Sequence, residues 1–299
     1  MSAIDELFQK LRSENKRAFM PFVTAGDPDL GFTAEVLKQL DAAGCHLVEL
    51  GIPYSDPIAD GPTIQASYTR ALNAGTKLDA IFETVSGVSG DLKMPIVTMV
   101  SYAIVFRLGV EAYLERAVAA GVSGLIVPDM PVDESAELAA QCAAKNVSLI
   151  QLITPTTPRE RAIEIAKTTT GFIYYVSITG ITGERTELPA ELTQNLQWLR
   201  EQTDLPICVG FGISGPDQVA ALKPYCDGMI VGSAIVRRVA AASEGHECWR
   251  CDCRCGCVFQ DHGRGGGGVK SEVGSRNAEC GMRNAECGVL VSGEVLPSG

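Results

Sequence analysis

Short apolar runs alternate with longer segments rich in Ala, Leu, Glu and Lys from the N-terminus to about residue 243. Each run is continuous and rich in β-branched residues, which is typical of parallel strands buried on both faces. The intervening segments, such as 30–44, 110–121 and 135–146, have the composition and length of helices. The sequence therefore predicts strands at 18–25, 46–52, 95–101, 124–129, 147–154, 172–177, 206–211 and 228–233.

The number and spacing of these units predict the fold class. Eight strand–helix units within about 240 residues are typical of a single-domain α/β protein with a (β/α)8, or TIM, barrel. A doubly wound open sheet is the alternative, but no G-x-G-x-x-G follows the first predicted strand. In a barrel, the carboxyl ends of all the strands meet on one face, where active sites are built. Polar residues or glycines stand at several of these ends: Thr24, Glu49, Ser101, Asp129, Thr154, Ser177, Gly210, Gly212, Gly232 and Ser233.

The character of the chain changes after residue 243. Residues 244–299 have no apolar periodicity, contain a four-glycine run and repeat "RNAECG" at 276–281 and 283–288. We therefore predict a barrel over 1–243 that lacks a recognisable final helix, and a disordered Cys/Gly-rich tail over 244–299. The tail's "CWRCDCRCGC" could bind a soft metal, but structural zinc sites usually pair two cysteine knuckles, so we expect no metal site.

Charge and hydropathy exclude several classes of partner. The chain carries 36 acidic and 25 basic residues, a formal net charge of −11, which argues against nucleic acid or an anionic membrane as partner. No apolar run approaches the roughly 18–20 residues of a membrane span, and the N-terminus has an amphipathic helical pattern instead of a signal peptide. We expect a cytoplasmic protein that acts on a small molecule.

Carboxylates occupy unusual places in "LVELGIPYSDPIADGPTIQ", residues 47–65. Glu49 lies within an apolar strand, where it is costly unless it is paired or functional. An ion pair is the alternative, but no Lys or Arg stands nearby in that strand. A buried carboxyl group holds its proton more readily than one in water, which suits a general acid/base. Asp60 follows on a loop whose prolines and glycine can aim it inward, whereas Asp56 has the sequence context of a turn former.

Glycine-rich segments follow the last three predicted strands. They are "TGITG" at 179–183, "VGFGIS" at 209–214 and "VGSAI" at 231–235. Glycine lets a backbone approach an anion closely, and a helix N-terminus beyond it offers unpaired N–H groups. Tight βα turns are the alternative role for these glycines. Their recurrence at adjacent strand ends favours a phosphate site.

Six segments together resemble the tryptophan synthase alpha subunit family. They are "PFVTAGDP" (21–28), "LVELGIPYSDPIADGPTIQ", "GLIVPDMPVDES" (124–135), "YYVSITGITG" (174–183), "VGFGIS" and "VGSAIV". The resemblance runs in order over about residues 4–242. It implies a TIM barrel that reversibly cleaves indole-3-glycerol phosphate into indole and glyceraldehyde 3-phosphate.

The resemblance also implies roles for particular residues. Glu49 matches the acid/base of the cleavage, and Asp60 matches the carboxylate that stabilises positive charge developing on the indole ring. The positions that match substrate-binding residues line or neighbour the indole slot, lie on the loop after the sixth strand, or form the phosphate cradle. The positions at the indole slot are Phe22, Tyr102, Leu125, Tyr174 and Phe211. The loop position is Thr182, and the positions of the phosphate cradle are Gly183, Gly212, Gly232 and Ser233.

The family works as an alpha2beta2 heterotetramer with a beta subunit that carries pyridoxal phosphate, so the resemblance implies no cofactor in this chain. One departure is "SYAIVFRLG", where the family commonly has an Asn-Pro pair near the beta subunit. Another is the missing last helix, which would expose apolar surface of the barrel and lower its stability. A different phosphate-sugar barrel enzyme of aromatic amino-acid biosynthesis is an alternative function. Such an enzyme would need, for instance, a Lys general acid at a strand end, and none is found. A non-catalytic barrel that only activates a beta subunit is another alternative.

Overall fold

The structure is a computed structural model that describes residues 1–57, 60–130, 132–177, 190–210 and 216–243. Its strands form a closed parallel barrel in chain order, with the last strand paired to the first. The predicted TIM barrel is therefore confirmed, and each predicted strand overlaps one that is observed. The strands are β1 (Ala18–Thr24), β2 (Val48–Gly51), β3 (Ile96–Met99), β4 (Val122–Ile126), β5 (Ser148–Ile153), β6 (Ile173–Val176), β7 (Ile207–Gly210) and β8 (Gly228–Val231).

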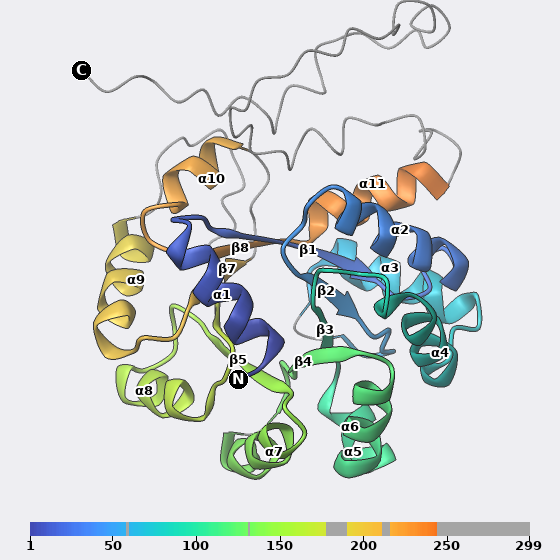
Figure 1. Ribbon diagram of the computed structural model, residues 1–299, viewed down its shortest axis with the longest axis horizontal. Helices are drawn as coiled ribbons and strands as arrows, with labels where there is room; N and C mark the ends of the chain where they lie inside the picture. Colours follow the sequence, from blue (N-terminus) through green and yellow to red (C-terminus); the bar gives the residue numbers. More distant parts are fainter. Residues whose placement is uncertain (58–59, 131, 178–189, 211–215, 244–299) are drawn as a thin grey trace, which may run out of the picture.

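Helices surround the strands as an outer ring, which Figure 1 shows. The long connections that return each parallel strand to the same edge are helical, as a right-handed βαβ unit requires. The helices are α1 (Ala3–Ser13), α2 (Leu30–Ala42), α3 (Pro62–Asn73), α4 (Leu78–Ser89), α5 (Tyr102–Leu108), α6 (Val110–Ala119), α7 (Val132–Ala144), α8 (Arg159–Thr168), α9 (Ala190–Gln202), α10 (Pro216–Leu222) and α11 (Ser233–Ser243).

Helix α1 differs from the others because it fills the amino-terminal end of the barrel. A capping box between Ser2 and Asp5 fixes its first turn. Its buried face, Ile4, Phe8 and Leu11, belongs to the cluster of side chains inside the barrel. The Phe8 ring lies 5.6 Å from that of Phe172, at the start of β6. The active end of the barrel must therefore be the opposite one.

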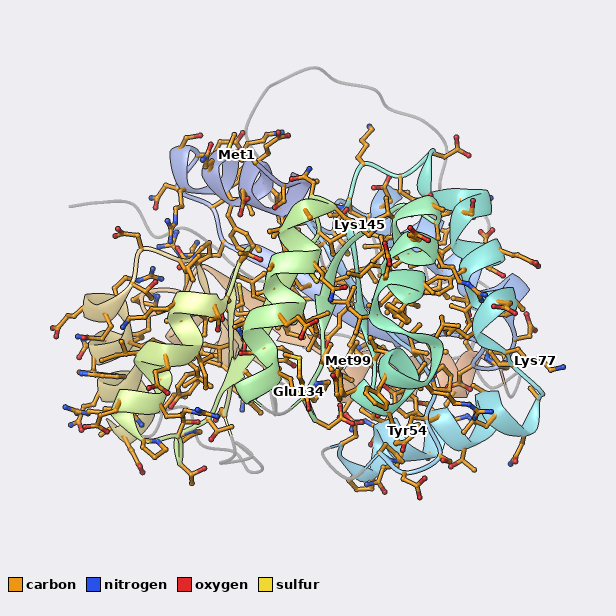
Figure 2. The ribbon with its side chains drawn as sticks, turned by 90° about the horizontal axis from the view of Figure 1, so that it is seen from below. Met1, Tyr54, Lys77, Met99, Glu134 and Lys145 are labelled. Atoms are coloured by element: carbon orange, nitrogen blue, oxygen red, sulfur yellow. The ribbon has the colours of Figure 1, made fainter. Side chains whose placement is uncertain are left out.

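Two glycines make room for this helix. A Cβ on Gly124 would lie 2.8 Å from Cδ1 of Ile4, and one on Gly171 would lie 3.1 Å from Cγ2 of the same side chain. Figure 2 shows Met1, just before α1, near one end of the molecule, with Met99 and Glu134 toward the other end. The glycines of β4 and the turn before β6 thus allow Ile4 to close the amino-terminal end.

Apolar side chains form an inner and an outer layer. The inner layer, inside the barrel, includes Met20, Phe22, Ile126, Ile150 and Tyr174. The outer layer lies between strands and helices in two clusters, one on the side of β2 to β5 and the other on the side of β6 to β8. Because side chains alternate along a strand, neighbouring residues contribute to different layers.

Helix α11 covers part of the barrel at the end of the described chain. It packs against β1 and α3, and its Val236 and Val239 are buried. The helix-like sequence at 234–243 is therefore helical in the structure. The predicted tail, 244–299, lies outside the described residues, so its disorder and its effect on stability stay predictions.

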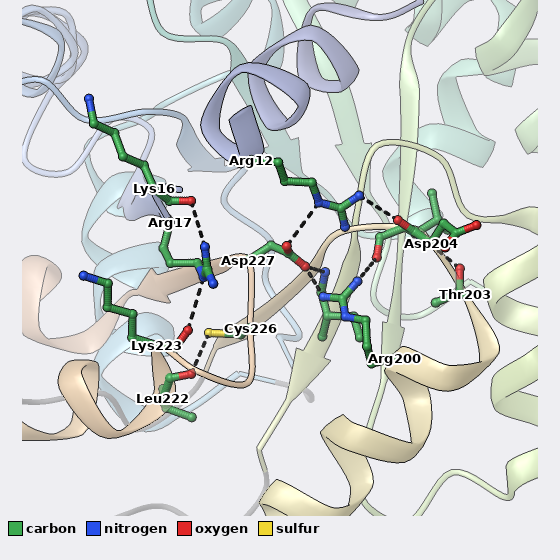
Figure 3. A network of polar contacts seen from close by, with 12 residues as sticks. Arg12, Lys16, Arg17, Arg200, Thr203, Asp204, Leu222, Lys223, Cys226 and Asp227 are labelled. Atoms are coloured by element: carbon green, nitrogen blue, oxygen red, sulfur yellow. Dashed lines mark hydrogen bonds and ion pairs between the residues drawn. The ribbon is translucent and has the colours of Figure 1, made fainter. Parts of the chain in front are cut away.

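A polar network joins α1 to the last strands of the barrel (Figure 3). Asp227, just before β8, accepts hydrogen bonds from Nε of Arg12 at 3.2 Å and from the backbone N–H of Ile207 at 2.9 Å. It also pairs with Arg200 of α9. Burial opposes ionisation of this carboxyl group, but the N–H of Ile207 and the two guanidinium groups outweigh it and lower the pKa of Asp227. The network thus ties three elements to one anion.

We expect Asp227→Asn to lower the free energy of unfolding at pH 7 by about 1–3 kcal/mol, because two guanidinium groups lose a partly buried anionic acceptor. The lowered pKa of Asp227 means that its contribution is present above the ordinary Asp pKa and is lost as the pH falls through the folded value. Urea unfolding at pH 7 and below pH 4 should therefore show a difference that shrinks on acidification. The control is Asp204→Asn. Asp204 is an exposed neighbour that bonds Arg12 through its backbone oxygen, which the substitution leaves in place.

Candidate active site

Glu49 lies inside the barrel with no partner for its carboxyl group. It stands in the middle of β2, paired in register with Phe22 of β1 and Val97 of β3, and is only 2% exposed. Neither carboxyl oxygen bonds to any residue that the structure describes. The alternative of a structural ion pair is therefore not observed among those residues. A buried polar group without a partner is costly, which points to a functional role.

The protonation of Glu49 follows from its burial. Removal from water raises its pKa to about 8, and the charge of Asp60 acts in the same direction. Glu49 is thus mostly protonated at neutral pH and can give a proton to a bound molecule. The carboxylate it would leave behind has no basic partner in the described chain, so it would readily take a proton back.

Asp60 has a different environment although it is close enough to act on Glu49. Partial burial raises its pKa to about 6, and the charge of Asp129 adds to this effect. Glu49 does not contribute because it is still neutral at the pH where Asp60 ionises. At pH 7 the two carboxyl groups therefore hold different states, with Glu49 protonated and Asp60 ionised, which is a common arrangement of acid and base.

The backbone around Asp60 is held by local bonds. Its N–H bonds the carbonyl of Pro57 at 3.2 Å, and its own carbonyl accepts a bond from the side chain of Gln65 at 2.8 Å. Gly61 then caps α3, with Pro62 at the first helical position, where a missing N–H costs nothing. Asp56 is exposed and accepts a bond from Ser55, so it serves the loop locally, as the sequence indicates.

A third carboxylate, Asp129, stands at the rim. It follows β4 and accepts hydrogen bonds from the Ser101 hydroxyl at 2.6 Å and from the Tyr102 N–H at 2.7 Å. These bonds attach it to the first turn of α5, where an anion is favoured by the helix dipole. Its charge adds to the larger effect of burial in raising the pKa of Asp60.

Apolar side chains of the inner layer surround the carboxyl groups. Phe22 and Tyr174, both predicted site residues, are members of this layer. Glycines at two strand ends leave space for these rings: a Cβ on Gly51 would lie 2.5 Å from Cζ of Phe22, and one on Gly210 would lie 2.5 Å from the Tyr174 hydroxyl. Aromatic side chains therefore lie on the inner face of the barrel, and Phe22 pairs directly with Glu49.

Leu125, one of the predicted substrate-binding residues, lies outside the interior of the barrel. Leu125 belongs to the outer layer, and it pairs with Thr98, whose hydroxyl contacts Tyr113 of α6. Its neighbour Ile126 faces the interior instead. The register between β3 and β4 shifts by one residue at Ile96 and Val97, and a shift of one residue exchanges the faces of a strand.

Tyr102, predicted to line or neighbour the indole slot, lies at the start of the helix that follows β3. It is the first residue of α5 and packs partly against the outer layer, while its hydroxyl donates to Glu134 of α7. That bond raises the pKa of Tyr102, with smaller effects of burial and of the charges on α7. The structure therefore places Tyr102 at the rim of the barrel and not in the interior group.

The proposed phosphate site is described in part. Gly232 is half-buried at the end of β8, and the nearest atoms to a Cβ there belong to Phe22 and Ile64, at 3.6 and 3.8 Å. Ser233 is exposed and begins α11, whose first N–H groups and dipole favour an anion. Four other predicted residues lie outside the described chain: Thr182, Gly183, Phe211 and Gly212.

Neither a metal site nor a membrane span is found where the chain is described. No group of three or more His, Cys, Asp or Glu residues there could hold a metal ion. Of the helices in the same part of the chain, none has the length and apolar character needed to cross a bilayer.

Sequence reasoning missed several interior residues. Met99 and Ile126 end β3 and β4 on the inner face, and Ile64 and Tyr68 extend inward from α3. Alternation along each strand could have identified the first two, had the register been known. The i, i+4 spacing of Ile64 and Tyr68 after the helix-starting Pro62 predicts a common helix face, but not that this face meets the interior.

Comparison with known proteins is consistent across sequence and structure. Residues 8–258 match the profile of the tryptophan synthase alpha chain family. A tryptophan synthase alpha chain from Rhodopirellula baltica is 54% identical over 247 residues, which are 82% of this chain and 89% of the relative. One from Synechocystis sp. is 48% identical over 257 residues, covering 85% and 97% of the two chains.

Solved structures agree with this similarity. Tryptophan synthase subunit alpha from Legionella pneumophila has a TM-score of 0.76 and 32% identity, with 83% of this chain and 92% of that chain covered. The tryptophan synthase A-subunit from Pyrococcus furiosus has a TM-score of 0.71 and 38% identity, with 77% and 92% covered.

We expect Glu49→Gln to stabilise the fold increasingly as the pH rises. The pKa of Glu49 is about 8 in the fold, against an ordinary value of 4.5, so the native state binds the extra proton between these values. Stability of the unmodified chain should therefore fall by up to about 1.4 kcal/mol per pH unit across this window, and the variant removes that loss. Urea unfolding of both chains at pH 5, 6.5 and 8 measures it.

The matched control is Glu83→Gln, which removes an exposed carboxylate from α4. Its stability relative to the unmodified chain should hardly change over the same range, because that side chain meets water in both states. A Glu49→Gln difference as constant as that of the control would contradict the assignment of Glu49 as a buried, protonated acid.

Proposed function

The chain belongs to the tryptophan synthase alpha chain family and is an enzyme of tryptophan biosynthesis, and we propose that it is a lyase that reversibly cleaves indole-3-glycerol phosphate into indole and glyceraldehyde 3-phosphate. The observation that carries this proposal is Glu49, a buried carboxyl group with a pKa of about 8 and no bonding partner among the described residues. A carboxyl group that is protonated at neutral pH can start the reaction as a general acid.

In the proposed reaction Glu49 first gives its proton to C3 of the indole ring, which becomes a cationic indolenine. The hydroxyl group on the adjacent carbon of the side chain then loses its proton to the Glu49 carboxylate. As that oxygen forms the aldehyde, the bond between C3 and the side chain breaks and its electron pair returns to the ring. Indole and glyceraldehyde 3-phosphate are released, and Glu49 regains its proton, so the cycle balances.

Asp60 has a complementary role in this proposal. It is ionised at pH 7 because its pKa is about 6, and as an anion it would accept a hydrogen bond from the indole N–H. Positive charge develops on the ring only after C3 is protonated, so this bond strengthens as the reaction proceeds. An interaction that is stronger in the transition state than in the ground state accelerates the reaction.

The two ends of the substrate suit different parts of the barrel. The indole ring would lie among Phe22, Ile126 and Tyr174 of the inner layer. The phosphate would meet Gly232 and Ser233 at the start of α11, and Thr182, Gly183, Phe211 and Gly212 are proposed to complete its surroundings as in the family. Phe22 and Ile64, the nearest side chains to Gly232, belong to the inner layer, so the proposed ring and phosphate positions adjoin the same wall of the barrel.

The name alpha chain implies a complex with a beta chain. We propose an alpha2beta2 assembly in which the beta subunit carries pyridoxal phosphate and takes indole onward, and no cofactor in this chain. Residues 53–60 and 179–188 match the family segments that face the partner. Neither the non-catalytic barrel nor a different phosphate-sugar enzyme is favoured, because the family match covers residues 8–258 and the buried Glu49 is suited to act as a general acid.

We expect the purified chain to release indole from indole-3-glycerol phosphate, and a beta subunit to increase the rate. Glu49→Gln should lower kcat by at least about 100-fold, because general acid–base catalysis contributes that much or more. Indole can be measured by chromatography under saturating substrate. Glu83→Gln is the control and should remain active. Release of indole by Glu49→Gln at the unmodified rate would contradict the proposal.

The rate should also depend on pH in a defined way. The active form has Glu49 protonated and Asp60 ionised, so kcat/KM should be largest near pH 7 and fall below about pH 6 and above about pH 8. Asp60→Asn should lower the rate and remove the acidic limb, since no carboxyl group then titrates there. A profile of Asp60→Asn with the same acidic limb would assign that limb to another group.

A further inference from the structure

Tyr68 reaches the interior of the barrel from a helix of the outer ring. It lies on α3, one turn beyond Ile64, and is 3% exposed. Its contacts belong to the inner layer, together with Phe22 and Ile64. The preceding residue, Ser67, is bonded to Thr24 at the end of β1 by a hydroxyl contact of 2.6 Å, which holds this part of α3 against the barrel. Tyr68 is thus a fixed part of the site's wall.

The hydroxyl group of Tyr68 lies over the end of β2. A Cβ on Gly51 would be 2.8 Å from it, so only glycine leaves the space that it occupies. Gly51 stands two residues after Glu49, and residues i and i+2 of a strand share a face. Tyr174 repeats this construction on the other side of the barrel, with its hydroxyl over Gly210. Both hydroxyl groups therefore lie on the inner face, near the carboxyl ends of their strands.

Tyr68 is an uncharged hydrogen-bond donor beside the carboxyl groups. Burial raises its pKa well above the ordinary value, and the charges of Asp60 and Glu49 act in the same direction. Within the described chain, neither oxygen of Glu49 has a hydrogen-bond partner, and the Tyr68 hydroxyl lies on the same inner face. Buried tyrosine hydroxyls usually have partners, since an unmade bond is costly. The Tyr68 hydroxyl and the Glu49 carboxyl group are therefore hydrogen-bonding groups on the same face of the interior.

The position of Tyr68 indicates which part of that molecule it meets. Phe22 and Ile64, its neighbours in the inner layer, are also the nearest side chains to Gly232 at the phosphate end. The wall formed by Phe22, Ile64 and Tyr68 therefore extends from Glu49 toward the start of α11. In the proposed function, the three-carbon chain of the substrate must cross this interval, and it carries hydroxyl groups.

We propose that Tyr68 is a specificity-determining residue whose hydroxyl group hydrogen-bonds a hydroxyl of the substrate's three-carbon chain beside Glu49. This inference rests on the proposed function and adds a contact to it. The contact would favour a ligand with hydroxyl groups on its three-carbon chain over one without them. When the ligand hydroxyl is missing, the buried Tyr68 hydroxyl is left unpaired, which weakens binding.

The test compares two ligands that differ only in these hydroxyl groups, indole-3-glycerol phosphate and indole-3-propanol phosphate. Binding is measured by calorimetry in Glu49→Gln and in Glu49→Gln with Tyr68→Phe, so that no turnover occurs. Tyr68→Phe should weaken binding of the glycerol ligand on the order of 3–10-fold and change binding of the propanol ligand by less than about twofold. Equal changes for both ligands, or no change for either, would overturn the proposal.

Controls separate this contact from general effects. Tyr113→Phe removes another buried tyrosine hydroxyl, which is bonded to Thr98 in the outer layer, and should weaken neither ligand selectively. Tyr68→Met also lacks the hydroxyl and must show the same difference between the two ligands. It replaces Tyr68→Phe in the test if that variant does not fold. Cleavage of indole-3-glycerol phosphate by the unmodified chain is measured first. A chain that cleaves it without the ligand selectivity refutes the role of Tyr68 alone, whereas no cleavage refutes the proposed function.

Discussion

Closure of the barrel around Glu49 is the constraint on which the site depends. Eight parallel strands pair edge to edge, so their interior is shut off from solvent except at the ends, and α1 fills one of these. A carboxyl group on the inner face of β2 then has neither water nor a basic residue of the described chain to stabilise its charge. Desolvation is the largest cause of its raised pKa, and the same desolvation costs stability. The raised pKa that suits Glu49 to acid catalysis and the loss of stability from burying it therefore have the same cause.

Glycines leave space for different side chains at the two ends of the barrel. Gly124 and Gly171 admit Ile4 of α1 at the amino-terminal end, whereas Gly51 and Gly210 admit the hydroxyls of Tyr68 and Tyr174 at the carboxyl end. An aliphatic side chain closes the first end, and polar tips face the second. The absence of a Cβ therefore allows apolar packing at the amino-terminal end and leaves space for hydroxyl groups at the carboxyl end.

The carboxyl groups of the site are arranged in order of solvent exposure. Asp129 is exposed and bonded to the first turn of α5, Asp60 is half-buried, and Glu49 is fully enclosed. The charge of Asp129 raises the pKa of Asp60, and that of Asp60 adds to the burial that raises the pKa of Glu49. Glu49 and Asp60 thus have different pKa values because each meets a different amount of water and a different neighbouring charge.

The sequence by itself determined the barrel, and it predicted a site at the carboxyl ends of the strands with Glu49 and Asp60 as its acids. Continuous apolar runs with regular spacing have few alternatives to buried parallel strands, and an acid within such a run is rare without a use. Only the tertiary structure decided which side chains meet these acids. Ile126 and not Leu125 lies on the inner face of β4, Tyr102 bonds Glu134 at the rim, and the packing of α3 places Tyr68 inside. Register and helix docking depend on contacts between residues distant in the chain, and the local pattern of a sequence does not record them.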